Sequence, residues 1–318
     1  MILLSLLSKY IDIICCESRL EYTYILSQYV ENKACAYIHP SIWPMKSGPC
    51  VTDKAVAMTI DLWHKIAETN PLVTKVPDPP DIPDSLSGLD LKKNIVVHAR
   101  ANESFGLANG RNVDISLYGQ CFRDLIDHGY TITRIGDCRM PSMPSIPGLY
   151  DLINPGIVCD KSWLHVWLIA NSMLFLGSQS GPSYIPHIFG TPFIIANNVC
   201  MGIVSATQEP MSFMLPKLWI RKDTQEPMNL EWIFTSRAAW LEADMIASIY
   251  EARHISSSVM RNSVLELARI ATKHSDIRGT QSIRISKGQK AWIEAVIGRG
   301  GLGKMHPSNA YLNSYRLF

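Results

Sequence analysis

The sequence predicts a doubly wound α/β domain, with a mostly parallel sheet and helices on both faces, in the last two-thirds of the chain. From Asn94 onward, short apolar runs rich in β-branched residues alternate with longer segments of helical periodicity. This alternation is typical of strands that are joined by crossover helices. Most of the runs are apolar throughout, as expected for strands that are covered on both faces.

The first half of this domain is predicted to hold three strands and one helix. The strand over 94–98 is followed by a helix over 114–127, whose first residue is an aspartate that can cap it. Gly129 fits the end of that helix, since glycine adopts the left-handed conformation at low cost. A second strand is predicted over 130–135 and, after a proline-studded loop, a short third strand at 157–158.

The second half continues the alternation. A helix over 160–170 precedes an apolar strand over 173–177. A Ser-Gln-Ser-Gly-Pro turn then opens a helix that ends near Gly190, and another strand covers 192–196. From about residue 241 the chain is predicted to be mainly helical.

A proline-rich segment at 77–84 suggests where the domains separate, because it can continue neither a helix nor a sheet. We therefore assign residues 1–90 to a shortened N-terminal region, which shows no clear βαβ rhythm. Residues 91–318 form the predicted Rossmann-like domain with its helical tail. The length of 318 residues agrees with about two domains.

Composition indicates which class of partner is excluded and in which cellular compartment the protein is expected. The net charge is only +2 and no basic stripe stands out, so we expect no nucleic-acid partner. None of the eight cysteines forms a C-x-x-C pair, which favours free thiols in a reducing compartment and therefore a cytoplasmic location. The apolar N-terminal run is too short to cross a membrane.

Tryptophans leave two interpretations open. They could form a patch that associates peripherally with a membrane or a partner, although packing in the core is the commoner use. The residues concerned are Trp163, Trp167, Trp219, Trp232 and Trp240.

The first candidate site residues end the strand at 94–98. Arg100 is suited to grip phosphate oxygens, since a guanidinium can bind them through two hydrogen bonds. His98 is either a packed core histidine or a proton donor and hydrogen-bonding group, and Glu103 follows closely. For Arg100 the alternative is a surface ion pair.

A second group follows the strand at 173–177. Ser178, Gln179, Ser180 and Gly181 open a helix, whose free N–H groups and positive dipole end suit a phosphate. Pro182 fits the first helical turn. An ordinary capped helix would explain the same residues. Since ligands bind beyond the carboxyl ends of parallel strands, we expect this turn and Arg100 at the same edge.

A third group follows the second strand. Arg134 and Asp137 either pair with each other or contact the phosphate, ribose or sugar of a ligand. Arg111, near the start of the helix at 114–127, could contribute to the same contacts.

Neither a metal motif nor a complete P-loop is present in the sequence. Residues 298–304 match G-x-x-x-x-G-K, but Met305 replaces the serine or threonine that would bind magnesium. We expect a turn there, after a helix over 290–297, and we predict no metal or cofactor.

Three segments together resemble a bacterial family of glycosyltransferases that is found in surface-polysaccharide and O-antigen gene clusters. They are NIVVHARANESFG, GYTITRIGD and LFLGSQSGPSYIPHIFGTPFIIANN. The layout is also similar to the C-terminal halves of O-fucosyltransferase-like and heptosyltransferase-like enzymes. The resemblance implies the GT-B architecture, in which two Rossmann-like domains enclose the active site.

The resemblance further implies metal-independent transfer of a sugar from a nucleoside-diphosphate sugar to a polysaccharide or lipid-linked acceptor. Arg100 and the turn 178–181 would hold the donor diphosphate. Arg134, Asp137 and Arg111 would contact the nucleoside or sugar, and His98 or Glu103 would be the catalytic base. Residues 1–90 would be the acceptor side. Two alternatives remain, a catalytically degenerate subunit that binds nucleotide sugars and a sugar-nucleotide epimerase.

Overall fold

The computed structural model describes eight segments of the chain, and all of them belong to one compact unit. The described residues are 81–101, 112–137, 140–153, 161–198, 211–227, 249–273, 285–297 and 306–315. The chain divides into the units Met1–Thr74 and Lys75–Phe318. The predicted division into residues 1–90 and 91–318, and the GT-B pairing of two domains, depend on residues outside the described segments and stay predictions.

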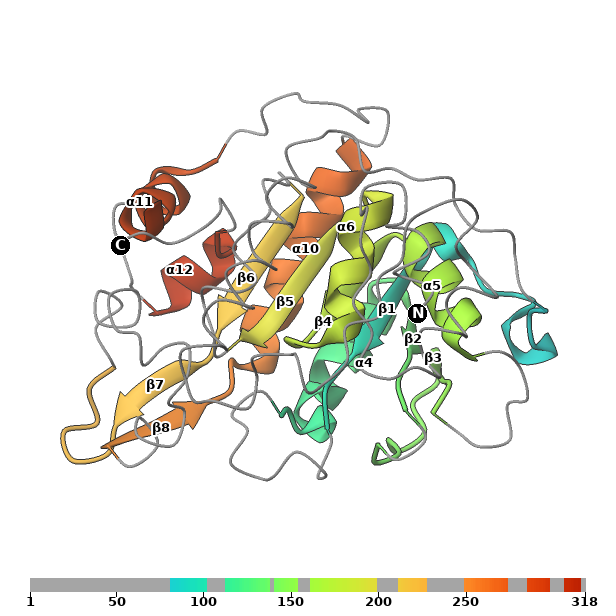
Figure 1. The fold of residues 1–318 in the computed structure, drawn as a ribbon, viewed down its shortest axis with the longest axis horizontal. Helices are drawn as coiled ribbons and strands as arrows, with labels where there is room; N and C mark the ends of the chain where they lie inside the picture. Colours follow the sequence, from blue (N-terminus) through green and yellow to red (C-terminus); the bar gives the residue numbers. More distant parts are fainter. Residues whose placement is uncertain are drawn as a thin grey trace, which may run out of the picture. The chain divides into compact units, whose positions relative to one another are not determined.

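A parallel sheet forms the centre of the described unit. Its strands are β1 (Asn94–His98), β2 (Thr131–Arg134), β3 (Leu149–Asp151), β4 (Leu174–Gly177), β5 (Phe193–Asn198) and β6 (Ser212–Pro216). Their order across the sheet is β3-β2-β1-β4-β5-β6, and each described neighbour pair is parallel (Figure 1). This is the strand order of the Rossmann fold. The predicted doubly wound sheet is therefore confirmed.

Helices cover both faces of this sheet because successive strand residues point to opposite sides. Ile95 and Val97 of β1 belong to one buried cluster, and Val96 between them belongs to another. The first cluster includes α4 (Gly119–Asp127) and α10 (Ser257–Lys273). The second includes α5 (Lys161–Asn171) and the buried Trp292 of α11 (Lys287–Ile297).

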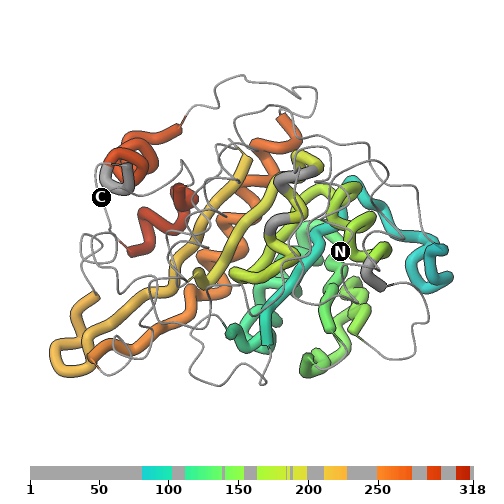
Figure 2. The backbone as a smooth tube through the Cα atoms, viewed as in Figure 1, coloured from blue at the N-terminus to red at the C-terminus, as the bar shows by residue number. Residues whose placement is uncertain are grey.

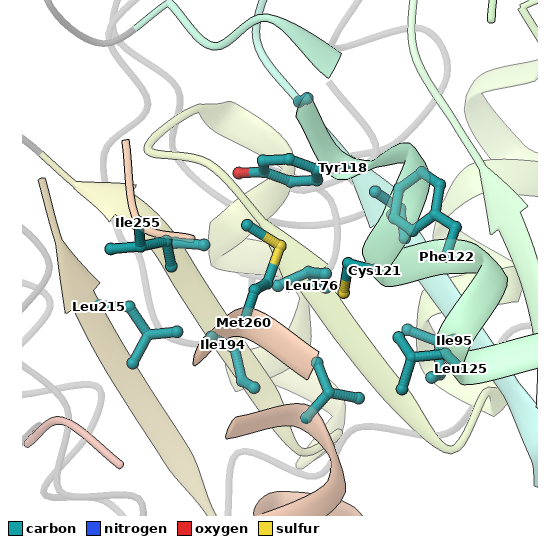
Figure 3. Close-up of a cluster of buried hydrophobic side chains, with 14 of the residues drawn as sticks. Ile95, Tyr118, Cys121, Phe122, Leu125, Leu176, Ile194, Leu215, Ile255 and Met260 are labelled. Carbon is teal, nitrogen blue, oxygen red and sulfur yellow. The ribbon is translucent and has the colours of Figure 1, made fainter. Parts of the chain in front are cut away.

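The first cluster is the one drawn in Figure 3. It joins side chains of four neighbouring strands to those of the covering helices: Ile95, Leu176, Ile194, Leu215, Cys121, Phe122, Leu125 and Met260. Full burial of each such aliphatic or aromatic side chain contributes about 1.5–3 kcal/mol. Cys121 packs as a small apolar group, and burial raises the pKa of its thiol to about 12.

The structure confirms the residues that were predicted to begin and end the helix around α4. Asp114 accepts a hydrogen bond from the Ser116 N–H (2.9 Å) and so caps the short 3-10 helix η5 (Ile115–Tyr118), which leads into α4. Gly129 follows α4 with φ +86°, the left-handed conformation that ends a helix. Residue 160, the other predicted cap, lies outside the described segments.

The structure adds strands that were not predicted, in three places. One is β3, Leu149–Asp151, whereas the predicted strand at 157–158 lies outside the described segments and stays a prediction. β6 was not predicted. Nor were β7 (Leu218–Arg221) and β8 (Tyr250–Arg253), which form an antiparallel ribbon that continues from β6 (Figure 2). β3 and β8 are only partly buried, so neither carries the apolar run that signals a central strand.

The tail is otherwise helical, as predicted, with α10, α11 and α12 (Asn309–Tyr315). α11 covers the helix expected before residues 298–304, which themselves are not described. The outer edge of β6 is partly covered by His306, whose carbonyl accepts a hydrogen bond from the Met214 N–H (3.1 Å). In the described part of the chain, no helix combines the length and apolar character needed to span a bilayer.

Candidate functional site

The candidate site lies where β1 and β4 stand side by side. From β1 the chain proceeds to β2 on one side, whereas from β4 it proceeds to β5 on the other. This reversal of strand order is the point at which open α/β sheets bind ligands, beyond the carboxyl ends of the strands. His98 and Gly177 are register partners, so the segments after both strands begin at the same level.

Hydrogen bonds hold these two segments together. The Ser178 N–H donates to the carbonyl of His98 (2.9 Å), and the Arg100 N–H donates to the Ser178 hydroxyl (2.7 Å). The Arg100 carbonyl in turn accepts from the Val113 N–H (2.8 Å). The backbone of Arg100 is therefore fixed beside the serine turn, and the two groups that the sequence placed at one edge do lie together.

A buried relay connects His98 to the turn. Its Nδ1 lies 2.9 Å from the Ser180 hydroxyl, and that hydroxyl lies 3.0 Å from the Ser178 carbonyl. Both contacts are hydrogen bonds only if His98 donates from Nδ1 and Ser180 donates onward to the carbonyl. In the neutral imidazole this arrangement leaves Nε2 as an acceptor.

The surroundings of His98 are electropositive. Burial, followed by the positive charges of His165, Arg134 and Arg100, lowers the pKa of His98 to about 4. The imidazole is therefore neutral at pH 7. An anion bound near it would favour the charged form and raise this pKa. Several basic groups near one strand end, facing a serine turn, suit a phosphate-bearing ligand.

The serine turn is compact on its inner side and open on its outer side. A Cβ on Gly177 would lie 2.3 Å from the Phe175 ring and 3.0 Å from the Ser183 hydroxyl, so glycine is required for this close packing. A Cβ on Gly181 would meet no atom of the described residues within 4 Å, apart from its own chain neighbours. A ligand could therefore approach the backbone there.

The predicted helix after the turn is present but short. It consists of one 3-10 turn, η6 (Gly181–Tyr184), with Pro182 in its first turn, followed by α6 (Ile185–Phe189). So few aligned peptides give a small dipole. The attraction for an anion must therefore come mainly from the basic side chains. Gln179, also predicted here, is almost fully buried.

Arg134 takes another role. Its side chain is 0% exposed, and its guanidinium donates to the Asp151 carboxylate (2.9 Å) and to the Pro141 carbonyl (2.7 Å). It thus ties β2 to β3 and to the loop between them. Its charge still acts on His98. Asp137 follows β2 and is partly buried, whereas Glu103 and Arg111 lie outside the described segments.

Sequence analysis did not select four polar residues that end or follow other strands. Asn197 and Asn198 end β5, Lys217 follows β6, and His254 follows β8. Burial lowers the pKa of Lys217 to about 8, and its ammonium donates to the Asn112 carbonyl (3.0 Å). The rule that selected residues after strands would have found the two asparagines. Lys217 and His254 follow strands that were not predicted.

Comparison with known proteins adds little to this geometry. No family model matches the chain, and no curated protein does. One similar solved structure is a protein from Listeria monocytogenes described as a UDP-N-acetylglucosamine 2-epimerase, with 12% identity and a TM-score of 0.31. The match covers 87% of this chain and 77% of that one. So weak a likeness establishes no shared activity, and the function proposed below is based on the site.

Proposed function

We propose that the protein is a glycosyltransferase that binds a nucleoside-diphosphate sugar at the carboxyl ends of β1 and β4. Its acceptor would be a polysaccharide or lipid-linked glycan, as the family resemblance implies, and its location the cytoplasm. The observation that supports the proposal best is the hydrogen-bonded junction of Arg100 with the serine turn. This junction stands at the point where the strand order reverses.

The chemistry of these groups matches a diphosphate. Arg100 carries a permanent charge that can form paired, charge-assisted hydrogen bonds with phosphate oxygens. The backbone at Gly181 supplies a neutral donor on the open side of the turn. When the bond to the sugar breaks, negative charge grows on the leaving diphosphate. Donors that are already in place stabilise that charge without reorganisation.

Metal-independent transfer would rely on these side chains alone. In the described segments, no three His, Cys, Asp or Glu side chains gather as metal ligands do. His98 is neutral at pH 7 and so is in the right state to accept a proton. Glu103 remains the other proposed base. Asp137 and Arg111 remain proposed contacts of the nucleoside or the sugar. We assign Arg134 to holding β2 and β3 rather than to direct contact with the donor.

The first experiment is a thermal-shift screen with nucleoside diphosphates and their sugars on the wild type and on Arg100→Ala. A ligand at ~100 times its dissociation constant adds about 2.7 kcal/mol to the free energy of unfolding. We expect one base to give this stabilisation and Arg100→Ala to lose most of it. Arg123→Ala, which removes an exposed arginine of α4, is the matched control and should retain it. The proposal fails if no diphosphate stabilises the folded wild type.

Product analysis with the stabilising sugar nucleotide then separates the alternatives. A transferase releases the nucleoside diphosphate only as the sugar reaches an acceptor. An epimerase changes the sugar without any acceptor and keeps the diphosphate attached. A degenerate binding subunit binds the donor and leaves it unchanged.

A further inference from the structure

Ser183 is a buried serine that the sequence analysis did not select, and it is bonded twice to the serine turn. Its N–H donates to the Ser180 carbonyl (3.1 Å), and its hydroxyl donates to the Ser178 carbonyl. It lies in η6, the 3-10 turn that follows Ser180, and only 3% of it is exposed. A hydroxyl so deeply buried is poorly placed to touch a ligand, so its role must be sought in the groups that it holds.

The Ser178 carbonyl receives a second hydrogen bond, from the Ser180 hydroxyl (3.0 Å). A carbonyl oxygen has two lone pairs, so these two serines use its full capacity. The Ser180 hydroxyl also contacts Nδ1 of His98 (2.9 Å), whereas Ser183 donates to the carbonyl alone. Because a peptide group is planar, fixing this carbonyl fixes the orientation of the whole peptide that follows Ser178.

Ser178 passes this constraint on to Arg100. Its side chain is buried, with 0% of the residue exposed, and its hydroxyl accepts the hydrogen bond of the Arg100 N–H (2.7 Å). Its own N–H donates to the His98 carbonyl (2.9 Å). Ser178 is thus bonded at its N–H, its hydroxyl and its carbonyl, and any shift of its backbone would move the acceptor of the Arg100 N–H.

The end of β4 leaves room for the Ser183 hydroxyl. Gly177 is the last residue of the strand, and a Cβ there would lie 3.0 Å from the Ser183 oxygen. Such a contact is closer than ordinary packing allows, so a larger residue at this position would push the hydroxyl away from the Ser178 carbonyl. The glycine and the serine therefore depend on each other.

We propose that Ser183 is a positioning residue for the diphosphate. It holds the Ser178 carbonyl and, through Ser178, the backbone of Arg100, so that the guanidinium is in place before the phosphates arrive. Binding groups that are held in this way lose less freedom when a ligand binds. The part that the diphosphate plays rests on the proposed function. Ser183 itself touches no ligand and acts through Arg100.

The first test measures the dissociation constant of the stabilising nucleoside diphosphate by isothermal titration. We expect Ser183→Ala to raise it about fivefold, the equivalent of one hydrogen bond. Ser263→Ala is the matched control, because Ser263 is fully buried and its hydroxyl also donates to a backbone carbonyl, that of Val259 (2.8 Å). The control also loses a contact with the Ser308 hydroxyl. It should therefore lower the urea midpoint at least as much, with the dissociation constant unchanged.

A double-mutant cycle then tests whether the effect passes through Arg100. In the Arg100→Ala background, Ser183→Ala should change the dissociation constant by less than about twofold. An unchanged constant in the single Ser183→Ala variant would overturn the proposal. Equal losses in both backgrounds, or the same loss in Ser263→Ala, would also overturn it. Ser183→Cys, whose thiol is a weaker donor, takes the place of Ser183→Ala if that variant does not fold.

If no diphosphate binds the wild type, the proposed function fails, and hydrogen exchange then decides on Ser183. Exchange of the Arg100 N–H, followed by NMR, should be faster in Ser183→Ala than in the wild type, with a smaller increase in Ser263→Ala. This result would support the hold of Ser183 on Arg100. Equal acceleration in the two variants, or none in Ser183→Ala, would overturn it.

Discussion

Buried polar side chains gather at both ends of the central strands, and the two groups differ in how their hydrogen bonds are satisfied. At the amino end, Asn94 donates to the Ser172 hydroxyl (2.8 Å). The same amide accepts from Thr133 (2.8 Å) and, at a longer distance, from Thr131 (3.4 Å). This network is neutral, and its members bond to one another.

The carboxyl end is built from different groups. Lys217 and Arg100 bring positive charge there, and burial together with that charge keeps His98 and His254 neutral. Buried atoms of Asn198 and His254 lack hydrogen bonds. The comparison shows that burial of polar groups alone does not indicate a site. What distinguishes the carboxyl end is positive charge together with unmet hydrogen-bonding capacity, as expected where a ligand completes the structure.

The largest expected effect comes from breaking the amino-end network. Asn94→Ala leaves the hydroxyls of Ser172 and Thr133 buried without their partner, at about 1–3 kcal/mol for each. We expect the free energy of unfolding to fall by about 3–5 kcal/mol in urea titrations. Stabilisation by the nucleoside diphosphate should be unchanged in kcal/mol. Loss of that stabilisation in a folded Asn94→Ala protein would contradict the separation of the two ends.

The next largest effect is a loss of folding stability at acidic pH. The pKa of His98 is about 4 in the folded protein and about 6.5 when exposed. Between these values the unfolded chain binds a proton that the folded protein does not, so stability falls as the pH is lowered from about 6.5 to 4. At about 1.4 kcal/mol per pH unit, the loss approaches about 3 kcal/mol.

Urea unfolding of the wild type and of His98→Gln across this pH range isolates that loss. The variant should lose less stability toward acid, since the remaining histidines contribute equally to both proteins. Bound diphosphate should also reduce the wild-type loss, because an anion raises the pKa of His98. Identical pH profiles for the two proteins would show that His98 is not held neutral.

The smallest effect is expected from Ser180→Ala. It removes one hydrogen bond from His98 and should lower the free energy of unfolding by about 1 kcal/mol. The ring nitrogen shifts of His98, measured by NMR, should change because the relay no longer fixes the Nδ1–H tautomer. Ser87→Ala removes an exposed hydroxyl that donates to the Asp84 carbonyl, and it should change neither quantity.

The sequence was sufficient to predict the centre of the fold. Strands β1, β4 and β5 are carried by apolar runs, and such runs are easily recognised because both faces are covered. β3 is a three-residue, partly buried strand, and β6 carries a serine and a proline at its ends. Local pattern does not distinguish such segments from loops, since their strand pairing is set by the rest of the sheet.

Because only some strands could be predicted from local pattern, only the site residues that follow those strands were predicted. His98, Arg100 and Ser178 follow predicted strands, and parallel pairing places them together. The partner of Arg134 is Asp151 at the end of β3, so its ion pair depended on a strand that was not predicted. Lys217 was missed for the corresponding reason, because it follows β6.

The most direct measurement is the position of the phosphates in a crystal structure of the protein with the stabilising nucleoside diphosphate. We predict phosphate oxygens within hydrogen-bonding distance of the Arg100 guanidinium and of the turn from Ser178 to Gly181. The Asn94 network should be unchanged. Phosphates bound at the amino end of the sheet, or away from Arg100 altogether, would contradict the assignment of the carboxyl end as the ligand site.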